Sequence, residues 1–388
     1  MSYTWNLPTK VFFGPGSLKK LVKTKMPGRK ALLLISNGTS ARKNGSLASV
    51  ENQLRDSGVD VALFAKIPPN PTTDVLDAGA AFCREQNCDF VIGLGGGSVL
   101  DAATIIAAIA PQQTGSVWDY VKGGTGGGLK LAQKPLPYIA ITTSAGTGSE
   151  VDCWGVVTNP STHEKVGFQG SYAALAIVDP ELMLSVPPEF TAYQGFDALF
   201  HSIEGYISRY TNEAAELFEL KAIANIAGYL PRAVADGSDL EARTQVAFAN
   251  TLSGYSMEVS TCVSQHAMEH AMSGCHEALP HGAGLIMLSL AYFTVWIEKK
   301  ACDERFVAMA KALGKKDAAC PGDFIDALKK LELDCGVAEL KMSSYGITPA
   351  EFPDLCANAK SSMAGLFKCD RFKMSDEEVI SIYAKSYR

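Results

Sequence analysis

Four of the six histidines in this 388-residue chain fall where helical spacing could gather them around a metal ion. Asp197 and His201 lie four positions apart in FDALFHSIEGYIS, and His266 and His270 repeat that spacing in QHAMEHAMS, so each pair faces one side of a predicted helix. His281 follows a proline at the expected start of a long apolar helix. Carboxylate and imidazole donors suit a divalent transition metal such as Fe²⁺ or Zn²⁺. Such a cation polarises a carbonyl or lowers the pKa of a bound alcohol, which is the activation that hydride transfer to a nicotinamide requires.

Each of these histidines has an ordinary alternative when it is taken singly. It could be a hydrogen-bonded core residue, and an i, i+4 pair could be one side of a solvated helix. Two such pairs and a Pro-His-Gly turn in one chain favour the metal site, and His163 and His276 are expected to be ordinary. The spacing alone does not decide whether His270 belongs to the ligand set.

Two glycine-rich segments follow predicted strands and could bind a dinucleotide. GLGGGSVLD, residues 93–101, leads into a helix expected over 102–110, and TTSAGTGSE, residues 142–150, follows the strand LPYIAI. Glycine lets the backbone approach a pyrophosphate, and the N–H groups of a helix's first turn form an anion site. Neither segment is a G-x-G-x-x-G fingerprint or a P-loop, so each could be a tight turn only. Their recurrence at consecutive strand ends of one sheet favours the binding function.

The turn after the predicted strand KALLLIS bears on the choice of cofactor. Its sequence, NGTSARK, holds no acidic residue to hydrogen-bond the adenosine ribose of NAD. Gly38 and the small hydroxyl side chains of Thr39 and Ser40, with two cations nearby, suit a 2′-phosphate instead, although a solvated surface turn would look the same. We therefore predict that NADP(H) is preferred over NAD(H) and that these three residues contact it.

The elements that must position these residues divide the chain in two. A length of 388 residues exceeds the roughly 250–300 that one core supports. Apolar β-branched runs around Leu33, Ala62, Ile92 and Ile139 alternate with helical stretches, which predicts an α/β Rossmann-like domain with a parallel sheet and helices on both faces. After DPELMLSVPP the pattern becomes helical. The predicted domains are a dinucleotide-binding domain, 1–188, and an all-α metal-binding domain, 189–388.

Composition excludes several classes of partner. The net charge of −6 gives no reason to expect nucleic acid or an anionic membrane. Ten cysteines without a C-x-x-C pair indicate free thiols in a reducing cytosol. The first residues lack the pattern of a signal peptide, and the longest uncharged apolar run, 283–297, is shorter than the ~18–20 residues that a bilayer demands. We expect that run to be a buried helix in a cytoplasmic protein.

Nearly end to end, the chain resembles the iron-containing (group III) alcohol dehydrogenases, the family of butanol, propanediol and lactaldehyde–propanediol dehydrogenases. The resemblance rests on FGPGSLKKL, PPNPTTD, GGGSVLD, TTSAGTGSE, DPELMLSVPP, DALFHSIEGYIS, HAMEHAMSGCHEALPHG and DRFKMSDEEVISIY. It implies a dehydroquinate synthase-like two-domain architecture and a homodimer that exchanges N-terminal strands. The activity it implies is NAD(P)-linked oxidation of small primary alcohols, or reduction of the aldehydes, by direct hydride transfer.

The resemblance also distributes roles among residues. It implies that Asp197, His201, His266 and His281 hold the metal, usually Fe²⁺, and that His270 lies near the substrate and aids proton transfer. Positions matched to the cofactor are Asn70, Gly95, Gly96, Gly97, Ser98, Asp101, Thr142, Thr143, Thr147 and Lys165. Thr104 stands where many relatives carry lysine, so that contact is not transferred. Substrate-facing positions are Trp154, Val156, Met257 and Ala364, each of which also fits a core position.

Other functions compete with this one. A zinc glycerol dehydrogenase or a dehydroquinate synthase-like lyase would share the architecture, but DALFHSIEGYIS and the Pro-His-Gly turn argue against both. A catalytically silent member retained for assembly or ligand binding is a different class, and the complete metal set argues against it.

Overall fold

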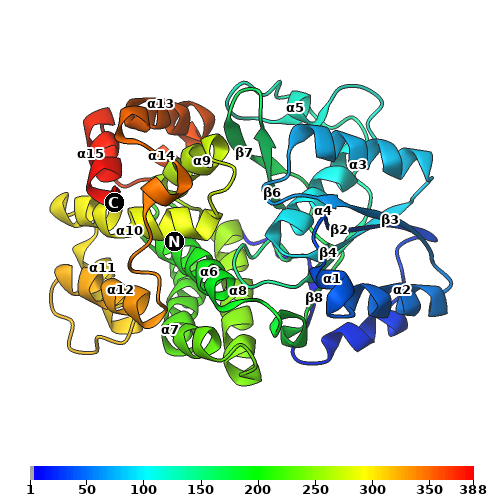
Figure 1. Cartoon of the computed structure of the whole chain (residues 1–388), viewed down its shortest axis with the longest axis horizontal. Helices are drawn as coiled ribbons and strands as arrows, with labels where there is room; N and C mark the ends of the chain where they lie inside the picture. Colours follow the sequence, from blue (N-terminus) through cyan, green and yellow to red (C-terminus); the bar gives the residue numbers. More distant parts are fainter. Residues whose placement is uncertain (1–3) are drawn as a thin grey trace. The chain divides into compact units, whose positions relative to one another are not determined.

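The computed structural model describes residues 4–388, and its elements fall into two compact units (Figure 1). The α/β unit comprises Asn6–Ser144 and Gly148–Ser185. The helical unit comprises Val186–Arg388 together with residues 4–5 and the loop Ala145–Thr147. The second glycine-rich segment therefore contributes its central residues to the helical unit.

A six-stranded parallel sheet forms the centre of the α/β unit, which confirms the predicted fold class. Its order is β1-β8-β5-β4-β2-β3, and every neighbouring pair is parallel. The strands are β1 Lys10–Phe13, β2 Lys30–Ser36, β3 Asp60–Ile67, β4 Phe90–Gly95, β5 Tyr138–Thr142 and β8 Leu175–Val178. An antiparallel hairpin of β6 Trp154–Asn159 and β7 Glu164–Gln169 lies outside this sheet.

Helices cover both faces of the sheet. Leu33, Ile92 and Ile141 share one buried cluster with apolar residues of η1 and α2, whereas α3 and α4 pack on the strands from the other face. A Cβ on Gly93 would lie 2.9 Å from the Cβ of Ala103, so glycine lets α4 approach β4. The short and long helices of this unit are η1 Ser17–Lys23, α1 Ser40–Lys43, α2 Ser46–Asp56, α3 Thr73–Glu85, α4 Gly97–Ile109, α5 Val117–Tyr120 and η2 Pro180–Met183.

Helix α4 begins five residues earlier than the predicted start at 102. Gly96 is its N-cap, and Gly97 and Ser98 already lie in its first turn. The glycine-rich segment is thus the amino end of the helix itself, where backbone N–H groups lack intrahelical partners and can bind an anion.

The helical unit contains no strand among its described residues. Its helices are α6 Pro188–Ile207, α7 Glu213–Ala235, α8 Leu240–Val259, α9 Ser264–Cys275, α10 His281–Glu298, α11 Asp303–Ala312, α12 Gly322–Asp334, η3 Met342–Tyr345, η4 Pro349–Glu351, α13 Phe352–Ser362, α14 Ala364–Phe367 and α15 Asp376–Ser386. Helices α6, α7 and α8 pack together, and α10 packs against α6, α9, α12 and α15. Around Phe293, rings of Phe200, Phe306 and Phe324 lie with centroids 5.3–6.3 Å away and form the core.

Helix α10, drawn in yellow in Figure 1, contains the apolar run 283–297. Within the described residues it is the single helix long and apolar enough to cross a bilayer, at 18 residues. Yet 61% of it is buried inside the protein, with Phe293 and Trp296 fully enclosed. A central core helix passes the same test of length and composition, and the packing of α10 is that of a core helix.

Candidate metal centre and dinucleotide site

Helix α6 supplies the first two side chains of the metal centre. Asp197 and His201 lie one turn apart on it, and Oδ1 of Asp197 is 3.2 Å from Nδ1 of His201. Both side chains are at least nine-tenths enclosed. Burial lowers the pKa of His201 to about 4, so its ring is neutral at pH 7 and keeps a lone pair for a ligand or a hydrogen bond.

Helix α9 brings His266 to the same point. Its Nε2 lies 3.6 Å from Oδ1 of Asp197, and its ring centroid is 4.4 Å from that of His201. Two buried carboxylates meet the amino end of this helix: Glu204 accepts from the backbone N–H of Val263 at 2.8 Å, and Asp370 accepts from that of Ser264 at 3.1 Å. These acceptor oxygens satisfy N–H groups that have no intrahelical partner, and they fix where α9 starts.

His281 completes the group as the first residue of α10. Its Nε2 lies 3.5 Å from Oδ1 of Asp197. The next residue, Gly282, explains how α10 comes so close to α6, because a Cβ there would lie 2.1 Å from the carbonyl oxygen of Tyr193. The Pro-His-Gly turn therefore combines a helix start, a donor and a close backbone approach.

Three imidazoles thus converge on one carboxylate oxygen. Ligand atoms of Asp197, His266 and His281 all lie within 4.8 Å of one another. Oδ1 of Asp197, Nδ1 of His201 and Nε2 of His266 are buried without a hydrogen-bond partner among residues 4–388. Buried polar atoms without partners are costly, and a divalent cation would satisfy all of them. A nitrogen-rich set with one carboxylate fits Fe²⁺ or Zn²⁺.

Two fully buried glutamates lie behind this group, and we did not predict them from the sequence. Nδ1 of His266 donates to Oε1 of Glu204 at 2.5 Å, and Nδ1 of His281 donates to Oε2 of Glu269. Each glutamate stands three residues after a histidine of the site, in His201-x-x-Glu204 and His266-x-x-Glu269, which is the signal that could have found them. A carboxylate on Nδ1 fixes the tautomer and leaves Nε2 free to bind a metal.

The structure places His270 next to this group as well. It lies one turn after His266, and its ring centroid is 5.3 Å from that of His281 and 6.4 Å from that of His266. Ligand atoms of Glu269, His270 and His281 lie within 4.8 Å of one another. All five side chains that the spacing singled out are therefore neighbours, whereas His276 pairs with Glu351 at 2.6 Å and His163 lies in a turn with φ 55°.

The predicted dinucleotide segments meet at the carboxyl edge of the sheet. Gly95 pairs with Thr142 in the β4–β5 register, and the backbone N–H of Thr143 donates to the carbonyl of Gly95 at 2.9 Å. Strand β2, which precedes Gly38, Thr39 and Ser40, neighbours β4. Three candidate segments thus follow three adjacent strands, at the edge where open α/β sheets bind ligands.

Other cofactor candidates have contacts within their own unit. Asn70, with φ 51°, donates its backbone N–H to Oγ of Ser98 at 3.3 Å, which ties its loop to the first turn of α4. Asp101 is buried and accepts from Oγ of Ser149 at 3.0 Å and from the N–H of Val156 at 3.1 Å. Its carboxylate therefore organises the loops around α4.

Two further residues predicted to bind the cofactor, Lys165 and Thr147, belong to different units of the structure. Lys165 is buried on β7 opposite Thr158. Thr147 belongs to the loop Ala145–Thr147 of the helical unit, where a Cβ on Gly146 would lie 3.2 Å from Oδ2 of Asp197. Within the segment TTSAGTGSE, Gly146 is therefore the residue that lies beside the aspartate of the metal centre.

Comparisons with known proteins agree with this geometry. Residues 8–180 match the family described as iron-containing alcohol dehydrogenase, and residues 191–387 match the C-terminal domain of the Fe-containing alcohol dehydrogenase family. The chain belongs to the iron-containing alcohol dehydrogenase family. It is therefore an NAD(P)-linked alcohol or aldehyde oxidoreductase, and its family implies iron and a nicotinamide cofactor.

Individual relatives align with this dehydrogenase over nearly its full length. The 1,3-propanediol dehydrogenase of Klebsiella pneumoniae is 32% identical over 400 residues, covering 99% of each chain. The NAD-dependent methanol dehydrogenase of Bacillus methanolicus is 30% identical and covers 92% of this chain and 95% of its own. Among solved structures, an archaeal halo-thermophilic alcohol dehydrogenase from a Red Sea brine pool is 34% identical with a TM-score of 0.93, covering 100% of this chain and 99% of its own.

The four residues predicted to face the substrate are divided between the units of the dehydrogenase. Trp154, 40% exposed, and half-buried Val156 lie on β6. Met257 lies on α8 with its Sδ 3.3 Å from Sγ of Cys262, and Ala364 is exposed at the start of α14.

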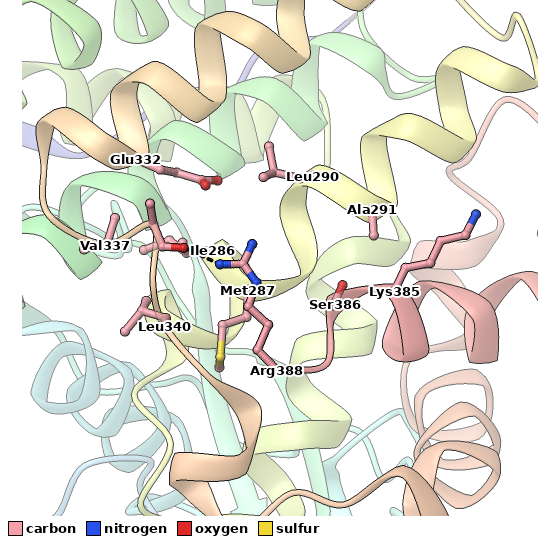
Figure 2. A pocket seen from close by; sticks show the side chains of 11 residues that line it. Ile286, Met287, Leu290, Ala291, Glu332, Val337, Leu340, Lys385, Ser386 and Arg388 are labelled. Carbon is pink, nitrogen blue, oxygen red and sulfur yellow. Dashed lines mark hydrogen bonds between the residues drawn. The ribbon is translucent and has the colours of Figure 1, made fainter.

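A pocket elsewhere in the helical unit is too small for the reaction. Figure 2 shows it lined by residues of α10, by Glu332 of α12 and by the last residues of the chain, with the Arg388 guanidinium donating to the carbonyl of Ala338. Its volume is about 40 Å³. Small-molecule sites measure roughly 300–1,000 Å³, so this pocket accommodates water and no cofactor.

Proposed function

We propose that this dehydrogenase interconverts short primary alcohols and aldehydes with NADP(H), using Fe²⁺ held by Asp197, His201, His266 and His281. The observation that carries the proposal is the approach of three imidazole nitrogens to within 3.2–3.6 Å of one oxygen of Asp197. A divalent ion there would act as a Lewis acid toward the substrate oxygen. Zn²⁺ is the alternative metal for the same donors.

The protein's own residues prepare that chemistry. Glu204 and Glu269 hold the Nδ1 protons of His266 and His281, which keeps each Nε2 lone pair directed at Asp197. Burial of Glu204, Glu269 and His266 keeps water away from the two carboxylate–imidazole contacts behind the metal centre. His270, adjacent to His281 but one turn beyond His266, is the side chain we assign to proton transfer.

The cofactor preference is proposed from the turn after β2. Residues 37–40 are exposed and contain no acid that would repel a 2′-phosphate. The family also includes an NAD-dependent methanol dehydrogenase. We therefore expect the turn at residues 37–40 to determine whether NADP(H) or NAD(H) is preferred. Gly95, Gly96, Gly97, Ser98, Thr142 and Thr143 would hold the pyrophosphate and nicotinamide portion beside the carboxyl ends of β4 and β5.

Other parts of the proposal follow from the relatives and from composition. Relatives that act on 1,3-propanediol and methanol support a short alcohol as substrate, with Trp154, Val156, Met257 and Ala364 as the residues to vary. Ten free cysteines support a reducing compartment, the cytoplasm. We also propose a homodimer, and a functional boundary at residues 188/189 between cofactor binding and metal binding.

Two paired measurements test this function. His281→Ala should lose both bound iron and the NADPH-dependent reduction of butyraldehyde, whereas His276→Ala, a matched control paired with Glu351, should keep both. Gly38→Asp has room, because the nearest atom to its Cβ is Oγ of Ser36 at 3.5 Å. It should lower kcat/KM for NADPH about tenfold or more while sparing NADH. Full turnover by iron-free His281→Ala would overturn the metal proposal, and equal kcat/KM for both cofactors in the parent would overturn the NADP preference.

A further inference from the structure

A buried cysteine, Cys262, lies beside two histidines of the metal centre but is not among the four residues proposed to bind iron. Cys262 lies in the loop between α8 and α9, four residues before His266, and is 2% exposed. Ligand atoms of His201, Cys262 and His266 all lie within 4.8 Å of one another. The thioether of Met257 adds a second sulfur, 3.3 Å from Sγ of Cys262.

We propose that His201, Cys262 and His266 form a second, overlapping site that binds a soft or borderline cation of the Zn²⁺ and Cd²⁺ class. Thiolate and imidazole are the donors that structural zinc sites use, whereas mononuclear non-haem Fe²⁺ of the histidine–carboxylate type is bound by nitrogen and oxygen. Around one tetrahedral zinc, with bonds of about 2.0–2.3 Å, ligand atoms lie roughly 3.3–3.8 Å apart. The ligand atoms of His201, Cys262 and His266, now within 4.8 Å of one another, would need to move closer together by only about 1 Å to bind one ion.

Each histidine of this set has a buried ring nitrogen without a hydrogen-bond partner among residues 4–388. These atoms are Nδ1 of His201 and Nε2 of His266, and both rings lie beside Cys262. Nδ1 of His266 is held by Glu204, so the ring can offer only Nε2 to a metal. When the ion binds, a metal–sulfur bond forms and the thiol proton leaves to solvent.

Two sites that share two histidines cannot be filled independently. His201 and His266 belong both to the proposed iron set and to the sulfur-containing set. A soft cation bound at Cys262 withdraws both imidazoles from the ion beside His281. The competition rests on the proposed function, and it makes Cd²⁺ an inhibitor that competes with Fe²⁺ for these two histidines.

Ultraviolet absorption tests the site without using activity. Cd²⁺ alone is added to metal-free, full-length protein in which the two exposed thiols, Cys275 and Cys320, are serine. One equivalent should produce a cadmium–thiolate charge-transfer band, and Cys262→Ser should abolish the band and weaken Cd²⁺ binding at least about tenfold. Cys335→Ser, which changes another buried thiol of the helical unit, should leave the band intact.

The outcomes separate this site from the proposed function. No band in the parent, or a band that persists in Cys262→Ser, overturns the second site. If Cys262→Ser fails to fold, Cys262→Ala is measured in its place, and the parent's band with its stoichiometry still decides. A band that survives saturation with Fe²⁺ would show independent sites and overturn the competition. A band in a protein that lacks dehydrogenase activity after loading with Fe²⁺ alone would count against the proposed function and leave the second site standing.

Discussion

Glu204 of α6 accepts a hydrogen bond from Nδ1 of His266 on α9, and Glu269 of α9 does the same for His281 on α10. Each glutamate therefore lies on the same helix as one histidine of the site and accepts a hydrogen bond from a histidine on the next helix of the centre. The three helices that carry the metal centre are connected in sequence by these two buried contacts. The arrangement fixes the rings before any ion binds, because a carboxylate can only accept at Nδ1.

Glu204→Gln should weaken metal binding through the tautomer of His266. The carboxylate also accepts from the N–H of Val263 at 2.8 Å, so a carboxamide that keeps this bond turns its NH₂ toward Nδ1. The ring proton then moves to Nε2, which faces Asp197, and its lone pair is lost to the metal. Affinity for Fe²⁺ should fall about 10–100-fold in a chelator competition.

A matched control distinguishes this effect from general destabilisation. Glu332→Gln changes another buried carboxylate, which accepts from Oγ of Ser289 at 2.9 Å and touches no histidine. Its Fe²⁺ affinity should match that of the parent. Unchanged affinity in Glu204→Gln, at a normal melting temperature, would contradict the positioning role.

His270→Ala should separate metal binding from proton transfer. If the ion is held by Asp197, His201, His266 and His281, the variant keeps its iron, measured by elemental analysis. Loss of a general acid–base group typically costs 10²–10⁴-fold in rate, so kcat for aldehyde reduction should fall by about 10² or more. A variant that loses iron would place His270 in the ligand set, as its helical spacing also allows.

Gly282→Ala should destabilise the helical unit and displace His281. The new Cβ would lie 2.1 Å from a backbone carbonyl, that of Tyr193, which cannot rotate away. Overpacking of this kind costs about 1–3 kcal/mol, and roughly 2–4 °C of melting temperature is lost per kcal/mol in a unit of this size.

Gly228→Ala on α7 is the control, because no atom lies within 4 Å of its Cβ position. Alanine there should stabilise the helix by about 0.5–1 kcal/mol. Calorimetric scans of both metal-free variants make the comparison, and equal melting temperatures would refute the steric explanation.

Features of the metal centre that depend on spacing within one helix could be predicted from the sequence, whereas features that depend on packing between helices could not. The i, i+4 pairs 197/201 and 266/270 reveal a shared helical face directly. That α6, α9 and α10 bring these faces together depends on packing, including the carbonyl beside Gly282, which no local pattern reveals. Cys262 reads as an ordinary free thiol until the loop before α9 is placed against His201.

The fold shows the same division. Apolar runs identified β2, β3, β4 and β5. Strands β2, β4 and β5 are buried on both faces and are therefore almost continuously apolar, whereas the edge strand β3 alternates between buried and partly or fully exposed residues. The four-residue strands β1 and β8 are too short to stand out, and their parallel pairing joins residues more than 160 positions apart. The β6–β7 hairpin mixes polar with apolar residues and lies outside the main sheet, so neither period nor composition predicted it.

The buried acid Glu219 should make stability fall as pH rises toward 8. Burial raises its pKa from 4.5 to about 8, although Ser256 and Thr211 donate to its two oxygens. The charged neighbours are Arg305 on α11, which opposes the shift, and Glu216 on its own helix, which adds to it.

The sign follows from the protons bound in each state. Below pH 4.5 the carboxyl is protonated in the folded and the unfolded chain. Between 4.5 and about 8 the unfolded chain loses this proton while the folded chain keeps it, so the unfolded state is progressively favoured. Glu219→Gln removes the titration, and its stability relative to the parent should rise across this window by at most about 1.4 kcal/mol per pH unit. Denaturant unfolding of both proteins at pH 5, 6, 7 and 8 measures the difference, and a difference that stays constant or falls with pH would show that Glu219 is ionised in the folded protein.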